Sequence, residues 1–172
     1  MNKVFVNARE VILPSWSGLA SRFAVKVLEE IKRDNWELSI LICGDKTITE
    51  LNSQYRGKAE PTDILSFSLG ETMKDGDRTV YLPGDIVISL DTLRENAQYF
   101  QIPQDEELRR LLIHGILHLD GMDHKTSEKQ EPMLVLQEEI LRRLNNEHII
   151  PFDFDRGENF VLEKTLFDGG EN

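Results

Sequence analysis

The sequence predicts a single domain that combines short β-strands with amphipathic α-helices. A chain of 172 residues with 40% hydrophobic content is long enough for one domain with a real core and short for two. Short apolar or alternating runs, typical of strands, separate longer segments with helical spacing. One segment, Leu108–Leu119, is apolar on nearly every side and predicts a buried central helix. We expect residues 1–150 to form this domain and residues 151–172 to be an acidic C-terminal extension without an assignable role.

The first third of the chain predicts a strand, a helix, a second strand and a second helix. Lys3–Val6 is short and β-prone, whereas Leu19–Arg33 repeats apolar residues at helical spacing. Leu38–Cys43 is a continuous apolar run and predicts a buried strand that contains the chain's single cysteine. Asp45 can cap a following helix, which we expect to end near Gly57.

The middle of the chain predicts two strands and a third helix. Ile64–Leu69 alternates polar and apolar residues, which predicts a strand whose buried face carries Leu65, Phe67 and Leu69. Gly70–Thr79 is polar and charged and is interpreted as an exposed loop or hairpin connection. Asp85–Leu90 predicts another strand, after which a helical pattern begins at Asp91.

The last third predicts the central helix and one further helix. Pro103 interrupts the chain before Asp105-Glu106-Glu107, whose charges favour a helix N-terminus. Ser127 with Gln130 resembles a capping box, although the helix that follows can also begin at Pro132.

The net charge, the cysteine count and the length of the apolar runs argue against several classes of function. The formal net charge is -11, with Asp+Glu 31 against Lys+Arg 20, which argues against binding of DNA or other nucleic acid by a broad basic surface. A single cysteine, Cys43, excludes an internal disulfide. No apolar stretch approaches the roughly 20 residues of a membrane span, and the N-terminus lacks a signal-peptide core. We therefore expect a cytoplasmic protein without a membrane partner.

Three of the four histidines fall within the segment His114–His124. His114 and His118 lie about 40° apart around a helix and one turn apart along it, so both imidazoles can reach one ion. Gly121 permits a left-handed turn that can bring His124 towards the same point. Three neutral imidazoles and one open position are typical of a catalytic zinc site. We expect one Zn²⁺ per chain, although nickel or copper can bind the same ligands.

The histidine spacing is shared with the metzincin pattern His-Glu-x-x-His-x-x-Gly-x-x-His, with one departure. Position 115 is glycine, whereas a metzincin needs glutamate there as the general base, so peptidase chemistry is weakened. Gly115 can instead reflect close approach of another backbone or of a substrate. Asp120 and Asp123 can accept imidazole N–H groups or merely cap the turn, and His148 is interpreted as ordinary surface.

Three separated motifs resemble those of the YbeY family of bacterial endoribonucleases and ribosomal RNA maturation factors. They are LNSQYRGKAEPTDILSF from Leu51 to Phe67, GDIVIS from Gly84 to Ser89, and HGILHLDGMDH from His114 to His124. Two departures are visible, because Met122 stands where the family usually has Tyr and Ser68 where it usually has Pro. Neither removes a ligand.

The resemblance covers roughly Leu38–Leu144 and carries specific expectations. It implies an α+β domain with a small mixed β-sheet packed with helices around a buried central helix, and a zincin-like site in which His114, His118 and His124 hold zinc. The family's essential arginine maps onto Arg56.

The leading hypothesis is a zinc-dependent, single-strand-specific endoribonuclease that acts in small-subunit (16S) ribosomal RNA maturation and ribosome quality control. Arg56 and His114 are the candidate catalytic residues, and Arg56 and Lys58 are the candidate substrate-binding residues, because a guanidinium and zinc can stabilise charge on phosphate oxygens. A surface salt bridge is the alternative for Arg56. A non-catalytic ribosome-assembly factor with a structural metal, or less favourably a zincin-like peptidase, are the alternative functions.

Because the protein is acidic overall, we expect RNA to be bound by a small local group of cations. Zinc, Arg56 and Lys58, with Arg22 and Lys26 as further candidates, would form a confined positive cleft on a negative body. Affinity for free RNA would then be modest, and the ribosome or its proteins would supply targeting.

Overall fold

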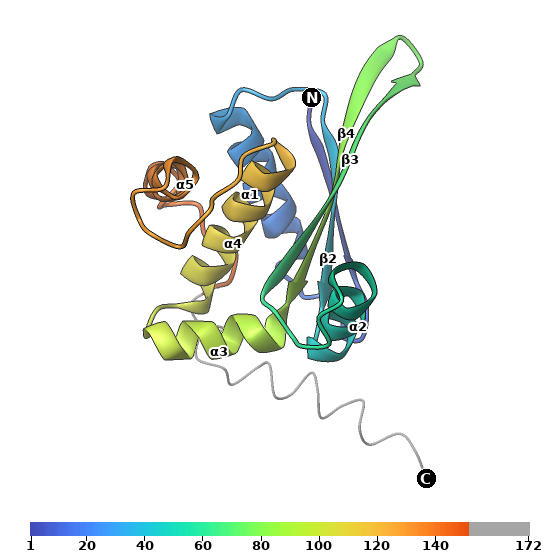
Figure 1. Cartoon of the computed structure of the whole chain (residues 1–172). Helices are drawn as coiled ribbons and strands as arrows, with labels where there is room; N and C mark the ends of the chain where they lie inside the picture. The colour runs from blue at the N-terminus through green and yellow to red at the C-terminus, as the bar shows by residue number, and fades with distance from the viewer. Residues whose placement is uncertain (152–172) are drawn as a thin grey trace.

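The computed structural model describes residues 1–151, which form a four-stranded mixed sheet and five helices (Figure 1). The elements are β1 (Lys3–Ala8), α1 (Ser17–Glu30), β2 (Glu37–Cys43), α2 (Asp45–Arg56), β3 (Ile64–Asp75), β4 (Arg78–Ser89), α3 (Leu90–Phe100), α4 (Gln104–Leu119) and α5 (Pro132–Arg143). The predicted α+β class is confirmed. No helix in this part of the chain has both the length and the apolar character that crossing a membrane requires.

The sheet has the strand order β1-β2-β4-β3. β1 pairs parallel with β2 and β2 pairs parallel with β4, whereas β3 pairs antiparallel with β4. The register places Ile40 opposite Ile86, so these two apolar side chains lie on the same face of neighbouring strands. Parallel pairs need crossover connections, and the connection from β1 to β2 contains α1.

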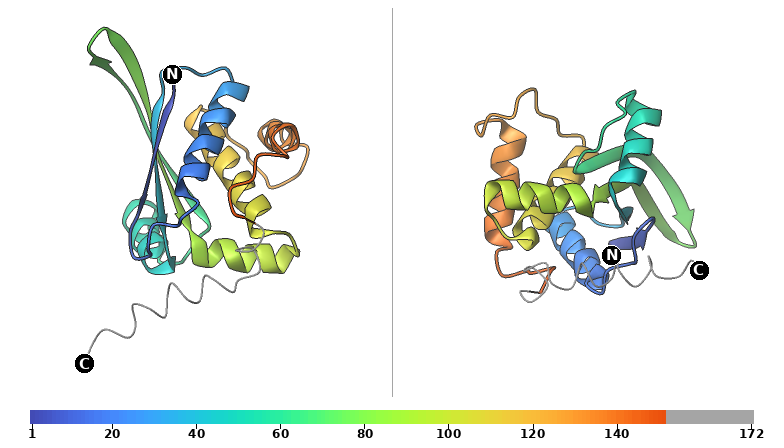
Figure 2. Two further views of the ribbon diagram at one scale, coloured as in Figure 1. Left: turned by 180° about the vertical axis from the view of Figure 1, so that it is seen from behind. Right: turned by 90° about the horizontal axis from the view of Figure 1, so that it is seen from below.

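Helices lie on both faces of the sheet (Figures 1 and 2). α1 and α4 cover one face and enclose the main core with it, whereas α2 packs against the other face near one end. The smaller core under α2 contains Cys43, Ile48, Leu65 and Val87. Cys43 is therefore buried, as the sequence predicts, and burial raises the pKa of its thiol to about 12.

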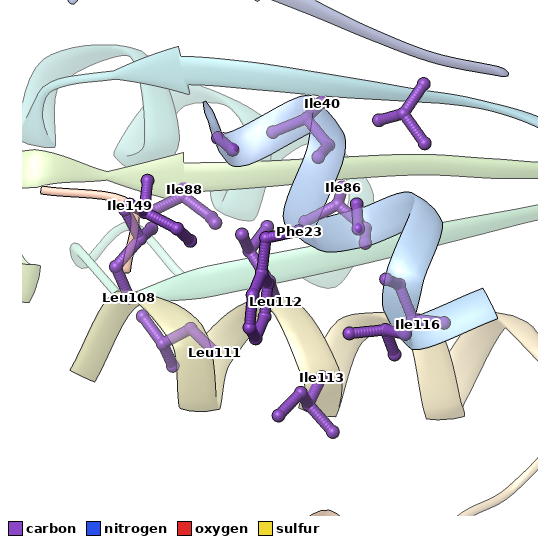
Figure 3. Packing of buried hydrophobic residues seen from close by; sticks show 14 of the residues in the cluster. Phe23, Ile40, Ile86, Ile88, Leu108, Leu111, Leu112, Ile113, Ile116 and Ile149 are labelled. Carbon is purple, nitrogen blue, oxygen red and sulfur yellow. The ribbon is translucent and has the colours of Figure 1, made fainter. Parts of the chain in front are cut away.

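The centre of the main core is α4, and the prediction of a buried central helix is confirmed. Leu108, Leu112 and Ile116 lie along one side of α4, and Phe23 of α1 and Ile86 of β4 meet them (Figure 3). All five side chains are 2% exposed or less. Each contributes about 1.5–3 kcal/mol by leaving water, which fixes the position of α4 against the sheet.

The hairpin between β3 and β4 is longer than the sequence predicts. Gly70–Thr79 is interpreted from sequence as an exposed loop or hairpin connection; it is a hairpin, and its strands remain paired from Glu71 opposite Leu82 to Asp75 opposite Arg78. Figure 1 shows this ribbon projecting beyond the helices, so polar residues are tolerated on both of its faces. For the same reason Leu69, predicted to be buried, is 52% exposed.

The side-chain caps that the sequence predicts for the N-termini of α2 and α5 do not form. Gly44 occupies the N-cap of α2, and the carboxylate of Asp45 instead accepts hydrogen bonds from the hydroxyls of Ser89 and Thr92, each at 2.7 Å. α5 begins at Pro132, the alternative start that the sequence allowed, and no capping box forms because the side chain of Gln130 donates to Glu128.

The segment after α5 is tied to the start of α4. The buried carboxylate of Asp105 accepts from the backbone N–H groups of Ile149 (2.7 Å) and Ile150 (2.8 Å). His148 is exposed, as predicted, but its Nδ1 also lies 3.0 Å from Asp105 Oδ2. The predicted extension lies outside the described residues from position 152 onward.

Candidate metal centre

α4 and the turn that ends it bring the three clustered histidines together. His114 and His118 lie one turn apart on α4, which ends at Leu119. Gly121 then adopts a left-handed φ of 94°, and the N–H of Met122 donates back to the carbonyl of Leu117 at 3.0 Å. The predicted left-handed turn is therefore confirmed, and it directs the chain back so that His124 faces the two helical rings.

The geometry of the three rings fits one metal ion. One ring nitrogen from each of His114, His118 and His124 can be chosen so that all lie within 4.8 Å of one another. The Nε2 atoms of His114 and His118 are 3.0 Å apart. Tetrahedral zinc with Zn–N bonds of about 2.0–2.1 Å requires its nitrogens to be roughly 3.3 Å apart, so little adjustment is needed.

Each ring also has a hydrogen-bond acceptor on the side away from this point. The acceptors are Gln137 Oε1 for His114 (2.7 Å), the carbonyl of Met122 for His118 (3.1 Å) and the carbonyl of Thr126 for His124 (2.8 Å). In every case the ring atom is Nδ1. Because an oxygen acceptor there favours Nδ1–H, each Nε2 keeps a free lone pair for a cation.

The electrostatics of the cluster favour a metal over a proton. Two Nε2 lone pairs that face each other at 3.0 Å repel unless a cation lies between them. Burial lowers the pKa of both His114 and His118, so a proton is a poor cation for this place. Three imidazole nitrogens form a donor set that binds zinc, nickel or copper. The residues present therefore fit a metal cofactor.

Gly115 explains why a peptidase base is missing. A Cβ at this position would lie 2.9 Å from Ile64 Cδ1 and 3.0 Å from Ile86 Cδ1. The glycine therefore permits close packing of α4 against side chains of the sheet, and not approach of a backbone or a substrate as the sequence had led us to expect. A glutamate here would point into the core and away from the histidines.

Neither nearby aspartate hydrogen-bonds an imidazole. Asp120 occupies the C-cap of α4, and its carboxylate pairs with Arg33 through Nε at 2.6 Å and Nη2 at 3.2 Å. Asp123 accepts from the backbone N–H of His124 at 2.8 Å and lies 4.0 Å from His118 Nδ1, too far for a hydrogen bond. Both residues stabilise the turn, which is the second of the two predicted readings.

The predicted cations lie at the end of α2. Arg56 is exposed on the last turn and close enough to His118 to contribute to the lowering of its pKa, after burial and His124. Within residues 1–151 no carboxylate pairs with its guanidinium, so the salt-bridge alternative finds no support there. Lys58 follows as an exposed residue, and no contact joins its ammonium to the histidines in this part of the chain. Lys26 pairs with Glu147 at 2.6 Å instead of remaining a free cation.

Two residues of the site are missed by sequence reasoning. Gln137 is buried on α5 and contacts His114 across 23 positions of the chain. Asp63, whose carboxylate accepts from Asn96 Nδ2 at 3.2 Å, lies close enough to His114 to oppose the fall in its pKa. Neither residue belongs to a metal-ligand spacing pattern, so the fold alone identifies them.

Comparison with known proteins points to one family. A family model described as Endoribonuclease YbeY matches residues 6–145, which include Arg56, the three histidines and Gln137. A relative from Treponema pallidum, named Endoribonuclease YbeY, is 45% identical over 142 residues, which cover 82% of this chain and 89% of the relative. One from Persephonella marina with the same name is 40% identical over 147 residues, or 85% and 95% of the two chains.

A solved structure shares the fold. The solution structure of TM1509 from Thermotoga maritima has 27% sequence identity and a TM-score of 0.57. The match covers 86% of this chain and 91% of TM1509.

Proposed function

The chain belongs to the YbeY endoribonuclease family, and from this membership we propose that it is a zinc-dependent endoribonuclease that cleaves single-stranded RNA. We further propose that its substrate is small-subunit (16S) ribosomal RNA during maturation, with a role in ribosome quality control and a cytoplasmic location. The proposal of nuclease activity follows from the name of the family, Endoribonuclease YbeY. The metal dependence is supported by the residues described next, and the ribosomal role rests on the resemblance to the family alone.

The observation that supports zinc dependence most directly is the arrangement of the three rings. Their Nδ1 atoms each face an oxygen acceptor, and the Nε2 atoms of His114 and His118 converge at 3.0 Å. A bound zinc ion would supply Lewis acidity at the phosphate and activation of water near neutral pH. His114 and His118 hold their neutral form because burial lowers the pKa of each.

Arg56 is proposed to stabilise the negative charge that develops on the phosphate oxygens. Its exposed guanidinium lies near His118 and has no carboxylate partner in the described chain, so it is free to form paired hydrogen bonds to a phosphate. Lys58 is proposed to bind the phosphate of a neighbouring nucleotide. Together these cations would limit the contact to a short stretch of RNA.

Two other functions remain as alternatives. A non-catalytic ribosome-assembly factor would use the same histidines for a structural metal and Arg56 only for RNA binding. A zincin-like peptidase is disfavoured, because position 115 holds a glycine packed against Ile64 and Ile86 where such an enzyme needs a glutamate.

The acidic body of the protein supports a need for targeting. With a net charge of -11, a few cations near the site cannot attract RNA over a long range. We therefore propose that the ribosome or its proteins deliver the RNA to the site.

Cleavage of a single-stranded RNA by wild type, Arg56→Ala and His114→Ala tests the proposal. We expect Arg56→Ala to lower the cleavage rate by about a hundredfold, as loss of one group that stabilises transition-state charge does. His114→Ala should lower it at least as much and should also weaken zinc binding. Equal residual cleavage by all three proteins would identify a contaminating nuclease and rule out the enzyme.

Lys46→Ala is the matched control for Arg56→Ala. Lys46 is an exposed cation at the other end of α2, roughly 15 Å away along the helix axis. We expect this variant to retain wild-type cleavage. Zinc content and cleavage measured together on every sample separate the two leading functions, because a factor with only a structural metal would bind zinc and RNA without cleaving.

A further inference from the structure

A pocket of about 760 Å³ lies beside the histidine cluster, between α3, α4 and α5. Phe100 at the end of α3, Glu107 and Arg110 on α4, and Gln137 on α5 line it, together with Lys129 from the segment after His124. Gln137 belongs to both places, because its side-chain oxygen also meets His114 Nδ1 at 2.7 Å. Figure 1 shows α4 running between α5 and the sheet, with α3 across its lower end. The pocket therefore continues from the cluster along α4.

The charges of the pocket do not suit a phosphate. The guanidinium of Arg110 is surrounded by carboxylates, at 2.8 Å from Glu138, 3.5 Å from Glu106 and 3.7 Å from Glu107. The charged residues of the lining are two carboxylates, Glu107 and Glu138, and two cations, Arg110 and Lys129, so the pocket has no excess of positive charge that would attract an anion. A ligand that offers hydrogen-bond donors and an apolar face fits this wall better than an anion does.

Glu107 is the residue whose hydrogen-bonding capacity is least used. Its side chain is only 8% exposed, yet its one ion pair is the long contact to Arg110, and no donor hydrogen-bonds its carboxylate within residues 1–151. Burial, with a smaller contribution from the neighbouring carboxylates, raises the pKa of this carboxyl. A buried carboxylate that lines a pocket and has no hydrogen-bond donor is stabilised by a ligand that donates N–H groups to it.

An aromatic ring stands at the rim of the same pocket. Phe100 is 61% exposed, an unusual position for a phenylalanine, and contacts Tyr99 edge-on at a centroid distance of 5.1 Å. Exposed aromatic rings are the usual platforms on which bases of single-stranded nucleic acid stack. The pocket thus combines a stacking surface with a buried acceptor.

We propose that this pocket binds a guanine base of the RNA substrate next to the bond that is cleaved. Guanine presents N1–H and the 2-amino group side by side, so both can donate to the two oxygens of Glu107. Adenine, cytosine and uracil each place an acceptor beside their donor, which a carboxylate repels. Glu107 lies seven residues before His114, roughly 10.5 Å along the helix, a span that a nucleotide or two of extended strand can bridge. The inference rests on the proposed RNA cleavage and adds a base preference to it.

Single-stranded oligoadenylates that contain one internal guanosine test this subsite, whichever bond near the guanosine is cleaved. We expect wild type to cut at one fixed distance from the guanosine about tenfold faster than elsewhere, the effect of one or two hydrogen bonds to a charged acceptor. Replacement of the guanosine by inosine, which lacks the 2-amino group, should remove most of this preference. Uniform cleavage along the oligomer would overturn the subsite and leave the endoribonuclease intact.

Glu107→Gln and Glu106→Gln form the matched pair of variants. Glu106 also contacts Arg110 but does not line the pocket, so Glu106→Gln should keep the guanosine preference. Glu107→Gln should lose it, so that cleavage near the guanosine is no faster than elsewhere in the oligomer. Loss of preference in both variants, or in neither, would contradict the assignment to Glu107.

Binding of mononucleotides separates failure of the subsite from failure of the proposed function. We expect 5′-GMP, but not 5′-AMP, to shift the backbone amide resonances of Phe100 and Glu107 in the full chain at millimolar concentration. A protein that showed this shift without cleaving any RNA would keep the guanine pocket and lose the nuclease proposal. Equal shifts with both nucleotides would overturn the guanine assignment.

Discussion

At the level of single residues, the candidate metal site depends on hydrogen bonds that the three histidines make at their Nδ1 atoms. Gln137 Oε1 lies 2.7 Å from His114 Nδ1, and two backbone carbonyls do the same for the other rings. Gln137 is therefore the one side chain among these acceptors. We expect it to hold His114 in the tautomer and orientation that leave Nε2 available.

Gln137→Leu tests this role. We expect zinc affinity to fall by about 10–100-fold, as it does when a partner of a metal-bound imidazole is removed. Competition with a chromophoric chelator measures the affinity, and ¹⁵N chemical shifts of His114 in the metal-free protein report its tautomer. Gln98→Leu, at an exposed position on α3, is the control and should match wild type in both measurements. An unchanged tautomer and affinity in Gln137→Leu would contradict the role.

The lowered pKa values of His114 and His118 have a consequence for stability. Below the unfolded value of about 6.5, the unfolded chain binds protons that the folded chain resists. The contribution of these rings to stability is therefore complete above that pH and is lost as pH falls towards their folded values. Urea unfolding of chelator-stripped protein should show a lower midpoint at pH 5 than at pH 7.5. The double variant His114→Gln, His118→Gln should lose much of this difference, and an undiminished difference would refute the cause.

The sequence was sufficient to predict that the three histidines cluster, but not which residues surround them. His114, His118 and His124 share one helix and its turn, so local spacing already predicts that they meet. Gln137 and Asp63 reach His114 from other elements, and only tertiary packing brings them there. For Gly115, the sequence shows a glycine where a related zinc pattern has glutamate. Only the structure shows that Ile64 and Ile86 pack closely against this position.

At the level of elements, the start of α4 is anchored by Asp105. This buried carboxylate pairs with Arg109 at 3.0 Å and accepts from His148 and from the N–H groups of Ile149 and Ile150. The sequence predicted only that its charge favours a helix N-terminus. The further contacts tie the segment after α5 to the helix that carries the histidines.

Asp105→Ala should destabilise the protein strongly. Removing the carboxylate leaves Arg109 and two backbone N–H groups buried without an acceptor, which we expect to lower the free energy of unfolding by about 3 kcal/mol. Glu106→Ala removes a neighbouring, partly exposed carboxylate and should cost less than about 1 kcal/mol. Urea unfolding of both variants checks the prediction. Equal losses would show that Asp105 does not anchor the segment.

Elements with a clear apolar pattern were predictable, whereas the β3–β4 ribbon was not. Leu108–Leu119 is apolar on nearly all sides, and the helix is indeed buried against α1 and the sheet. Residues 70–79 lack any apolar periodicity, because the ribbon extends past the helices and has no core to face. Its pairing comes from continuation of the β3–β4 ladder, which single-sequence patterns do not reveal.

At the level of the whole molecule, the fold brings the three histidines and one exposed arginine to neighbouring places on an acidic protein. α4 supplies two of the histidines, the turn after it supplies the third, and α2 supplies Arg56. The net charge of -11 acts against RNA elsewhere on the surface. The proposed function therefore requires above all that the three histidines hold a metal ion with which RNA is cleaved.

RNA cleavage by the full chain, after zinc is removed and then restored, tests this requirement most directly. Chelator-stripped wild type should cleave single-stranded RNA poorly and should regain full activity at one equivalent of zinc per chain. His148→Ala, which removes the one histidine outside the cluster, should behave in the same way, whereas His118→Ala should not regain activity at that zinc concentration. Undiminished cleavage by the metal-free wild type would contradict the account.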